Sequence, residues 1–79
     1  MSDSVFSEEG EFFTFSTVLE REPGLYEASV LFERKSDHVR TLVPAMRHKL
    51  TERFNDRDVA MQAALQYAHD RAYSGDVGF

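Results

Sequence analysis

The chain has 79 residues, enough for one small domain, and a formal net charge of −5, which disfavours a surface built mainly to neutralise phosphates. It contains no cysteine, which excludes disulfide bonds and thiolate zinc sites, so its seven Phe and three Tyr must supply much of the apolar contact. No apolar run approaches the roughly 20 residues that span a bilayer. Without cysteine or an apolar secretory segment, we expect a cytoplasmic location and no membrane association.

The first ten residues are polar and acidic, and we expect residues 1–10 to form a flexible N-terminal arm from which Phe6 could dock on the domain edge. A single α+β domain is predicted over residues 11–75. Residues 76–79 follow the last predicted element and are expected to form a mobile tail. The predicted organisation is therefore one domain with a flexible segment at each end.

Apolar and polar side chains alternate in two segments, residues 11–20 and 25–34, as they do on β-strands. Between them, Glu22-Pro23-Gly24-Leu25 places Pro second and Gly third, as a type II turn requires. The two segments therefore predict an antiparallel hairpin. In the first strand, alternation places one set of side chains on a common face: Phe13, Phe15, Thr17 and Leu19. In the second strand, the corresponding set is Tyr26, Ala28, Val30 and Phe32.

The stretch from Val39 to Phe54 fits two structures. Its apolar residues are spaced by one, three or four positions, as on a helix, but Pro44 would cost about 3 kcal/mol inside that helix unless the helix began there. The alternative is two further strands, over residues 39–43 and 46–53. We favour the strands, because a sheet of three or four strands gives a helix a larger surface to cover than a lone hairpin does.

Residues 56–74 are predicted to form a helix, with Asn55 as its N-cap and Gly75 as its C-terminal stop. The predicted inner face is rich in small side chains: Ala60, Ala63, Ala64, Tyr67 and Ala68, flanked by Val59, Leu65 and Ala72. Small side chains let a helix approach a Phe-rich sheet closely. The strands and the helix together predict a two-layer α+β domain, an antiparallel β-meander covered by one C-terminal helix.

No motif indicates an enzyme, a cofactor or a small-molecule ligand. The chain lacks a Gly-x-Ser-x-Gly elbow and a Gly-rich phosphate loop, and its carboxylates are so numerous that pairs arise by chance. The three histidines, His38, His48 and His69, are not spaced for metal binding on one helix, so no metal site is predicted. We therefore expect a non-enzymatic protein.

Apolar residues outside the main faces indicate a binding surface. Phe12, Val18 and Leu31 would form an apolar patch on the far side of the sheet, which suits a protein partner or a second copy of the chain. The alternative is that the 39–54 segment folds back over them. Three acidic residues near the N-terminus are further candidates for a partner interface: Glu8, Glu9 and Glu11.

Nucleic-acid binding is a second candidate function, through a local basic patch that comprises Arg40, Arg47, Lys49 and Arg53. The predicted topology is shared with the end of a double-stranded-RNA-binding domain. However, Asn55-Asp56-Arg57-Asp58 is acidic where that family has a basic cluster, and no basic residues surround the Phe of residues 11–19. Nucleic-acid binding is therefore less expected than protein binding. An acidic chain could also inhibit a nucleic-acid-binding protein by mimicking phosphate charge.

The outline resembles that of small bacterial and prophage proteins built from a strand meander and an Ala-rich C-terminal helix. The resemblance covers most of the chain and rests on pattern, without a shared motif. It implies a fold and no functional residues. These observations together favour a small protein-interaction module.

Overall fold

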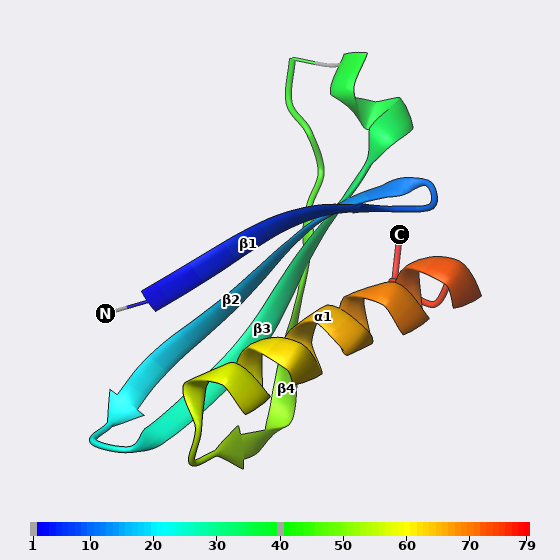
Figure 1. Cartoon of the computed structure of the whole chain (residues 1–79). Helices are drawn as coiled ribbons and strands as arrows, with labels where there is room; N and C mark the ends of the chain where they lie inside the picture. Colours follow the sequence, from blue (N-terminus) through cyan, green and yellow to red (C-terminus); the bar gives the residue numbers. More distant parts are fainter. Residues whose placement is uncertain (1, 40) are drawn as a thin grey trace.

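The structure, a computed structural model, describes residues 2–39 and 41–79. A short 3-10 helix, η1 (Lys35–Val39), follows the third of four strands, and the helix α1 (Arg57–Ser74) follows the fourth. Figure 1 shows α1 lying across one face of the twisted sheet. The predicted antiparallel meander with one C-terminal helix is confirmed. The strands lie side by side in chain order: β1 (Ser2–Glu9), β2 (Phe12–Glu22), β3 (Leu25–Arg34) and β4 (Met46–Phe54).

Residues 2–9, which we expected to belong to a flexible arm, form β1, so that expectation is wrong. β1 pairs with β2 along its whole length. Gly10, whose φ of 58° lies in the left-handed region, allows the tight turn between the two strands. The ring of Phe6 explains why this polar segment docks, because it packs against the rings of Phe13 and Phe15.

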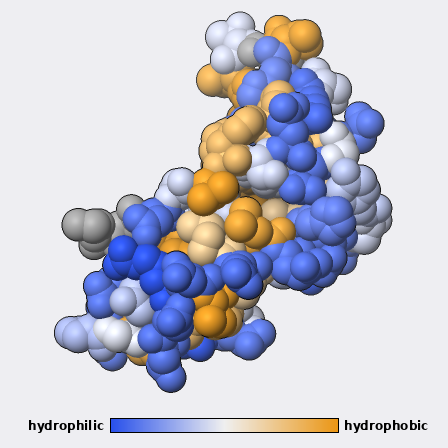
Figure 2. Space-filling model, in the orientation of Figure 1, coloured by the Kyte–Doolittle hydropathy of each residue, from blue (hydrophilic) through white to orange (hydrophobic). Residues whose placement is uncertain are grey.

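The connection between β3 and β4 differs from the prediction of a strand over residues 39–43. Lys35–Val39 forms η1, and residues 41–45 are irregular. β3 already has β2 and β4 as neighbours, so this segment cannot pair beside β3. Two apolar side chains of this segment project into solvent: Val39 is 91% and Leu42 83% exposed, and Figure 2 shows apolar residues at this end of the molecule. Residues 46–54, by contrast, form β4, as favoured over a helix.

The register between β2 and β3 decides which side chains meet α1. Thr14 lies opposite Phe32 and Ser16 opposite Val30, so these four side chains share the face beneath the helix. Four Ala residues of the predicted inner face and its flank, Ala60, Ala64, Ala68 and Ala72, are buried against this surface. Val59, which was expected to flank that face, is 55% exposed. The buried apolar side chains of the core are Phe12, Val18, Ala28, Val30, Phe32, Ala60, Ala64, Ala68, Ala72 and Val77.

A bulge near the hairpin turns the side chains of β2 to the faces opposite to those predicted. Glu22 pairs with Leu25 across the turn, whereas Glu20 pairs with Tyr26, so Arg21 has no partner on β3. One extra residue shifts the register by one position, and every side chain of β2 before the bulge then points to the other face. The Phe residues expected beneath the helix therefore lie on the opposite side of the sheet.

The predicted far-side patch of Phe12, Val18 and Leu31 is wrong for the same reason. Phe12 and Val18 are buried beneath α1, at 9% and 1% exposed. Leu31 lies opposite Phe15 on the other face, as predicted. Residues 46–54 do not fold over Leu31, because they form β4 and pair beside β3 in the same sheet.

Both ends of α1 are capped. Asp56, and not the expected Asn55, is the N-cap, since its carboxylate accepts a hydrogen bond from the Val59 N–H at 3.1 Å. Gly75 closes the helix as predicted, with a φ of 77° and an N–H that donates to the Arg71 carbonyl at 3.0 Å.

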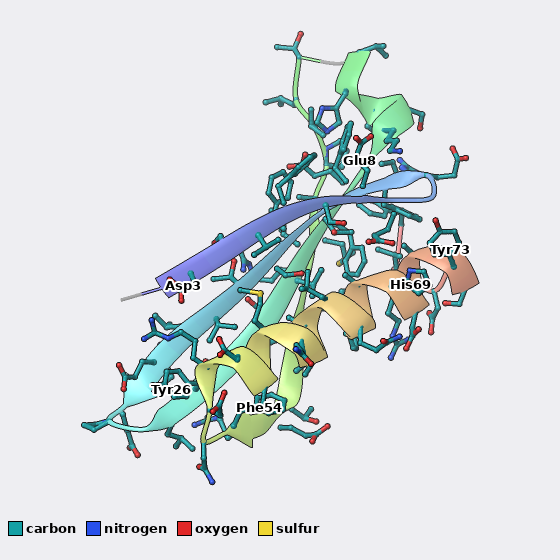
Figure 3. All side chains as sticks on the ribbon, viewed as in Figure 1. Asp3, Glu8, Tyr26, Phe54, His69 and Tyr73 are labelled. Carbon is teal, nitrogen blue, oxygen red and sulfur yellow. The ribbon has the colours of Figure 1, made fainter. Side chains whose placement is uncertain are left out.

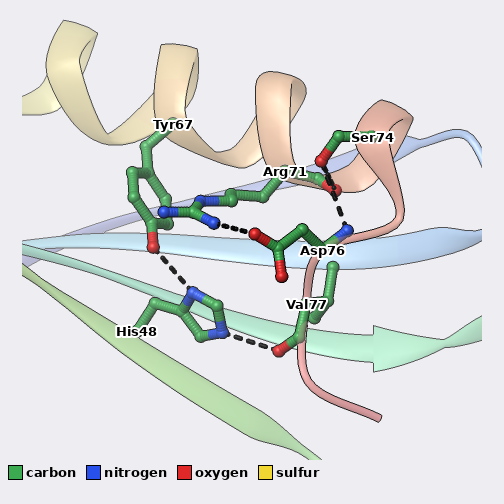
Figure 4. A network of polar contacts seen from close by, with 6 residues as sticks. All are labelled: His48, Tyr67, Arg71, Ser74, Asp76 and Val77. Carbon is green, nitrogen blue, oxygen red and sulfur yellow. Dashed lines mark hydrogen bonds and ion pairs between the residues drawn. The ribbon is translucent and has the colours of Figure 1, made fainter.

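The C-terminal tail, which we expected to be mobile, packs against the domain. Val77 is 1% exposed, and its carbonyl oxygen accepts a hydrogen bond from Nε2 of His48 at 2.7 Å (Figure 4). The other ring nitrogen of His48 lies 2.7 Å from the Tyr67 hydroxyl. The ring of Phe79 stacks 6.1 Å from that of Phe12. Val77 and Phe79 thus extend the apolar contacts beyond the end of the helix.

Candidate functional site

The sheet face opposite α1, which we call the open face, carries no α-helix within residues 2–39 and 41–79. Directly opposed residues of antiparallel strands point to the same side, so the register defines the rows of this face. One row crosses all four strands with the side chains of Phe6, Phe15, Leu31 and Arg47. The next row is polar and contains Ser4, Thr17, Ser29 and Lys49.

Three rings on the open face, Phe6, Phe13 and Phe15, form what we call the aromatic cluster. The centroid of the Phe6 ring lies 5.6 Å from that of Phe13 and 5.2 Å from that of Phe15. Phe13, Phe15 and the neighbouring Leu31 are half-buried, whereas Phe6 is 54% exposed. The open face therefore has an apolar centre that remains in contact with water.

Charged side chains border the aromatic cluster where η1 begins. Lys35 Nζ lies 5.6 Å above the centroid of the Phe13 ring, and the His38 ring meets the same ring edge-on at 4.6 Å. Lys35 also pairs with Glu8 at 3.2 Å, and His38 pairs with Glu33 at 2.8 Å. The Lys35–Glu8 ion pair and the His38–Glu33 hydrogen bond hold η1 against the aromatic cluster, and Phe6 stays exposed.

Three of the four predicted basic-patch residues lie along β4 on the open face. Arg47 is opposite Leu31, and its guanidinium donates to Ser29 Oγ at 3.3 Å. Lys49 and Arg53 follow on the same side of the strand. The fourth predicted residue, Arg40, lies outside the described residues. β4 thus brings cations to the same surface as the aromatic cluster, although the two are distant in the sequence.

Glu27 anchors one end of this basic strand. Its carboxylate, only 10% exposed, pairs with Arg53 at 3.1 Å, Lys49 at 3.3 Å and Arg21 at 3.6 Å. A hollow of about 460 Å³ opens beside it. That hollow is lined by three cations and three carboxylates, so it has no excess charge to attract an ion; its residues are Leu19, Glu20, Arg21, Glu22, Glu27, Lys49 and Arg53.

The three predicted acidic interface residues do not share one surface. Glu8 lies on the open face, Glu9 on the face beneath α1, and Glu11 in the turn after β1. The Ser7 hydroxyl, which donates at 2.8 Å, and the His69 imidazole at 3.0 Å hold the pKa of Glu9 below its ordinary value, while partial burial opposes them. Glu9 is therefore ionised at neutral pH, which suits an ion pair and not a general acid.

No group of three His, Asp or Glu side chains in the described part of the chain is placed to hold a metal ion. The three histidines lie in different environments. His38 and His69 pair with carboxylates, and His48 is held between Tyr67 and the Val77 carbonyl (Figure 4).

The aromatic cluster was not identified as a site from the sequence. Phe13 and Phe15 were assigned to the core, and Phe6 to a loose arm. The available signal was the adjacent pair Val5-Phe6, since a strand directs two such side chains to opposite faces. Lys35, which borders the cluster, gave no signal in the sequence.

The fold and this surface define a small two-layer α+β domain with one uncovered sheet face. Comparisons with protein-family models, curated proteins and solved structures found no match to the chain. Among the described residues, no helix combines the length and the apolar composition needed to cross a bilayer.

Proposed function

We propose that this protein is a cytoplasmic, non-enzymatic interaction module of bacterial or prophage type that binds another protein through the open face of its sheet. The observation that carries the proposal is the aromatic cluster: three Phe rings on a sheet face that no α-helix of the described residues covers. More than half of the Phe6 side chain remains in water in the monomer, and a partner that buries it recovers the remaining hydrophobic free energy.

The arrangement of the face supports a protein partner. Complete burial of one Phe side chain contributes about 1.5–3 kcal/mol, and Leu31 extends the apolar area beside Phe15. Polar and charged side chains surround this centre, as at protein interfaces, where an apolar core lies within a polar rim. Because Arg47 lies beside Leu31 at the border of the aromatic cluster, the complementary surface carries apolar side chains beside a carboxylate.

Binding by matched surface variants tests this proposal. Proteins captured from source lysate by the wild type, Phe6→Ser and Val59→Ser would be compared, and the affinity of a purified captured partner then measured. Val59 is the control, because it is 55% exposed on α1, away from the open face. We expect Phe6→Ser to raise the dissociation constant at least tenfold and Val59→Ser to leave it within twofold. Equal binding by both variants would refute the proposed surface.

Single-stranded nucleic acid is a second candidate ligand, favoured by one observation. Arg47, Lys49 and Arg53 lie on the same face as the aromatic cluster, and nucleic-acid platforms combine cations for phosphates with rings for bases. The anisotropy of a fluorescent oligonucleotide should then rise on binding and fall steeply with added salt. Substitution of Lys49 by Gln should weaken that binding. No anisotropy change at low salt would exclude this ligand.

Inhibition by phosphate mimicry has less support. It would need carboxylates that are free to meet a basic partner. Glu8 and Glu9 instead pair with Lys35 and His69 within the chain, at 3.2 and 3.0 Å.

A further inference from the structure

We propose that β1 pairs in antiparallel fashion with β1 of a second copy of this chain, about a two-fold axis that passes beside Val5. This interface uses the edge of the sheet and is distinct from the open face. Among the described residues, β1 has β2 as its only strand neighbour, so one side of its backbone is unpaired. α1 packs mainly on β2 and β3, which leaves the edge clear (Figure 1).

The two edges of the sheet differ in how they are protected. β4 carries features by which proteins prevent pairing with a further strand. It has three basic residues, Arg47, Lys49 and Arg53, and its register with β3 is irregular between Lys49 and Arg53. β1 has no basic residue and no irregular register, and its charged side chains are three carboxylates. It pairs regularly with β2 through all of its residues and contains no Lys, Arg or Pro. β1 is thus the edge that can accept another strand.

The charges of β1 do not oppose self-association. Its three carboxylates each have a partner within the chain, and Figure 3 shows Asp3 and Glu8 towards opposite ends of the strand. Asp3 pairs with Arg57 at 3.2 Å. Glu8 pairs with Lys35 at 3.2 Å, and Glu9 with His69 at 3.0 Å. Two of the three carboxylates, Asp3 and Glu8, therefore have a cation beside them when two copies of β1 approach.

The sequence of β1 selects one register. With the axis beside Val5, each Val5 faces its counterpart, Asp3 faces Ser7 and Ser4 faces Phe6, so no like charges are opposed. An axis beside Phe6 would place Asp3 of each copy opposite Glu9 of the other copy, and directly opposed like charges are destabilising. An axis beside Ser4 pairs residues 2–6 alone and forms fewer hydrogen bonds.

This register also joins the two open faces. Val5 is 39% exposed and would be covered by its counterpart on the side of α1. On the open face, the two Phe6 residues become diagonal neighbours with Cα atoms about 7–8 Å apart, a distance that aromatic side chains can bridge. The dimer therefore has an eight-stranded sheet with two aromatic clusters side by side, and symmetric two-fold dimers are the commonest oligomers.

Light scattering after size exclusion, from micromolar to millimolar protein, tests the dimer. We expect the wild type to be dimeric at the upper concentrations. Val5→Lys and Val5→Glu should each raise the dimer dissociation constant at least tenfold, and an equimolar mixture of the two should restore the dimer. Val59→Lys on α1 should have no effect. A wild type that remains monomeric, or a Val5→Lys variant that still dimerises, would overturn the proposal.

Cysteine crosslinking tests the register even if a charged variant fails to fold. The chain has no cysteine, so each introduced thiol is the only one present. Opposed residues of antiparallel strands have Cα atoms about 4.5–5.5 Å apart, within disulfide range. Val5→Cys should form a disulfide-linked dimer on mild oxidation, and Ser7→Cys should do so when mixed with Asp3→Cys but not alone. Crosslinking by Ser7→Cys alone, or none by Val5→Cys, would overturn the register.

Discussion

Phe6 of β1 lies directly opposite Phe15 of β2 on the open face, with ring centroids 5.2 Å apart. Phe15 in turn lies opposite Leu31, so an apolar row crosses three strands of the sheet. The row ends at Phe6, which has a ring on one side and water on the other. A residue in this position contributes little to folding and much to the association that covers it.

Substitutions at two Phe residues should separate these roles. Phe12→Ala removes a ring buried against Phe32 and Phe79, and should lower the free energy of unfolding by about 3–5 kcal/mol. Phe6→Ala removes a ring that is more than half exposed, and should cost about 1 kcal/mol. Urea denaturation of both variants measures these values. Similar losses for the two would contradict the assignment of Phe6 to a binding surface.

Ser16 should be a site of stabilisation. Its side chain is fully buried beneath α1, and its hydroxyl lacks a hydrogen-bond partner among the described residues. A buried, unsatisfied hydroxyl costs about 1–3 kcal/mol, so Ser16→Ala should raise the free energy of unfolding. Thr17→Ala on the opposite face of β2 is the control and should not stabilise the protein. A decrease in the melting temperature of Ser16→Ala would show that the hydroxyl has a partner.

The environment of Glu9 predicts a pH dependence of stability. Its pKa is lowered from the ordinary 4.5 by the Ser7 hydroxyl and the His69 imidazole, so its ionised form favours the folded state. That stability is fully present above the ordinary carboxyl pKa and is lost as the pH falls through the lowered value. Urea denaturation should show wild type more stable than Glu9→Gln at about pH 7, by less than about 1 kcal/mol.

The difference between wild type and Glu9→Gln should shrink to zero as the solution is acidified through the carboxylate range. Glu11→Gln is the matched control, since Glu11 is exposed in the turn after β1. Its stability should follow that of the wild type at every pH. A Glu9→Gln difference that persists in acid would show that the contribution of Glu9 does not depend on its charge.

The fold was predictable because its strongest signals are local. The switch from alternating to helical spacing located β2, β3 and α1, and the Pro23-Gly24 turn was found from residue type, since Gly24 has the required φ of 76°. The edge strand β1 was missed because its outer side is exposed and its composition is therefore polar. Composition alone does not distinguish such a strand from an arm.

The candidate site could not be predicted, because it depends on a single unpaired residue. Without a bulge, the Glu22–Leu25 pair would set a register in which Phe13 and Phe15 meet the helix, as the sequence pattern implies. Arg21 shifts the register by one, which sends Thr14 beneath α1 and the Phe rings to the open face. No residue type near position 21 signals this bulge, whereas its consequence extends along the whole strand.

The bulge predicts opposite effects for two single-residue deletions in β2. Deletion of Arg21 removes the one residue that has no partner on β3, so Glu20 keeps Tyr26 as its neighbour and every face is preserved. The cost should be limited to the lost bulge and the Arg21–Glu27 ion pair, which is partly exposed and contributes less than about 1 kcal/mol. This variant should unfold cooperatively in urea.

Deletion of Thr17, in the middle of the same strand, should abolish cooperative unfolding. It forces the residues on one side of the gap to slip by one position against β3, so that buried side chains such as Phe12 would turn to the open face. Two-dimensional NMR spectra of the two deletion variants would compare them directly. Dispersed amide signals for the Arg21 deletion and their loss for the Thr17 deletion are expected, and the reverse result would show that Arg21 does not set the faces of β2.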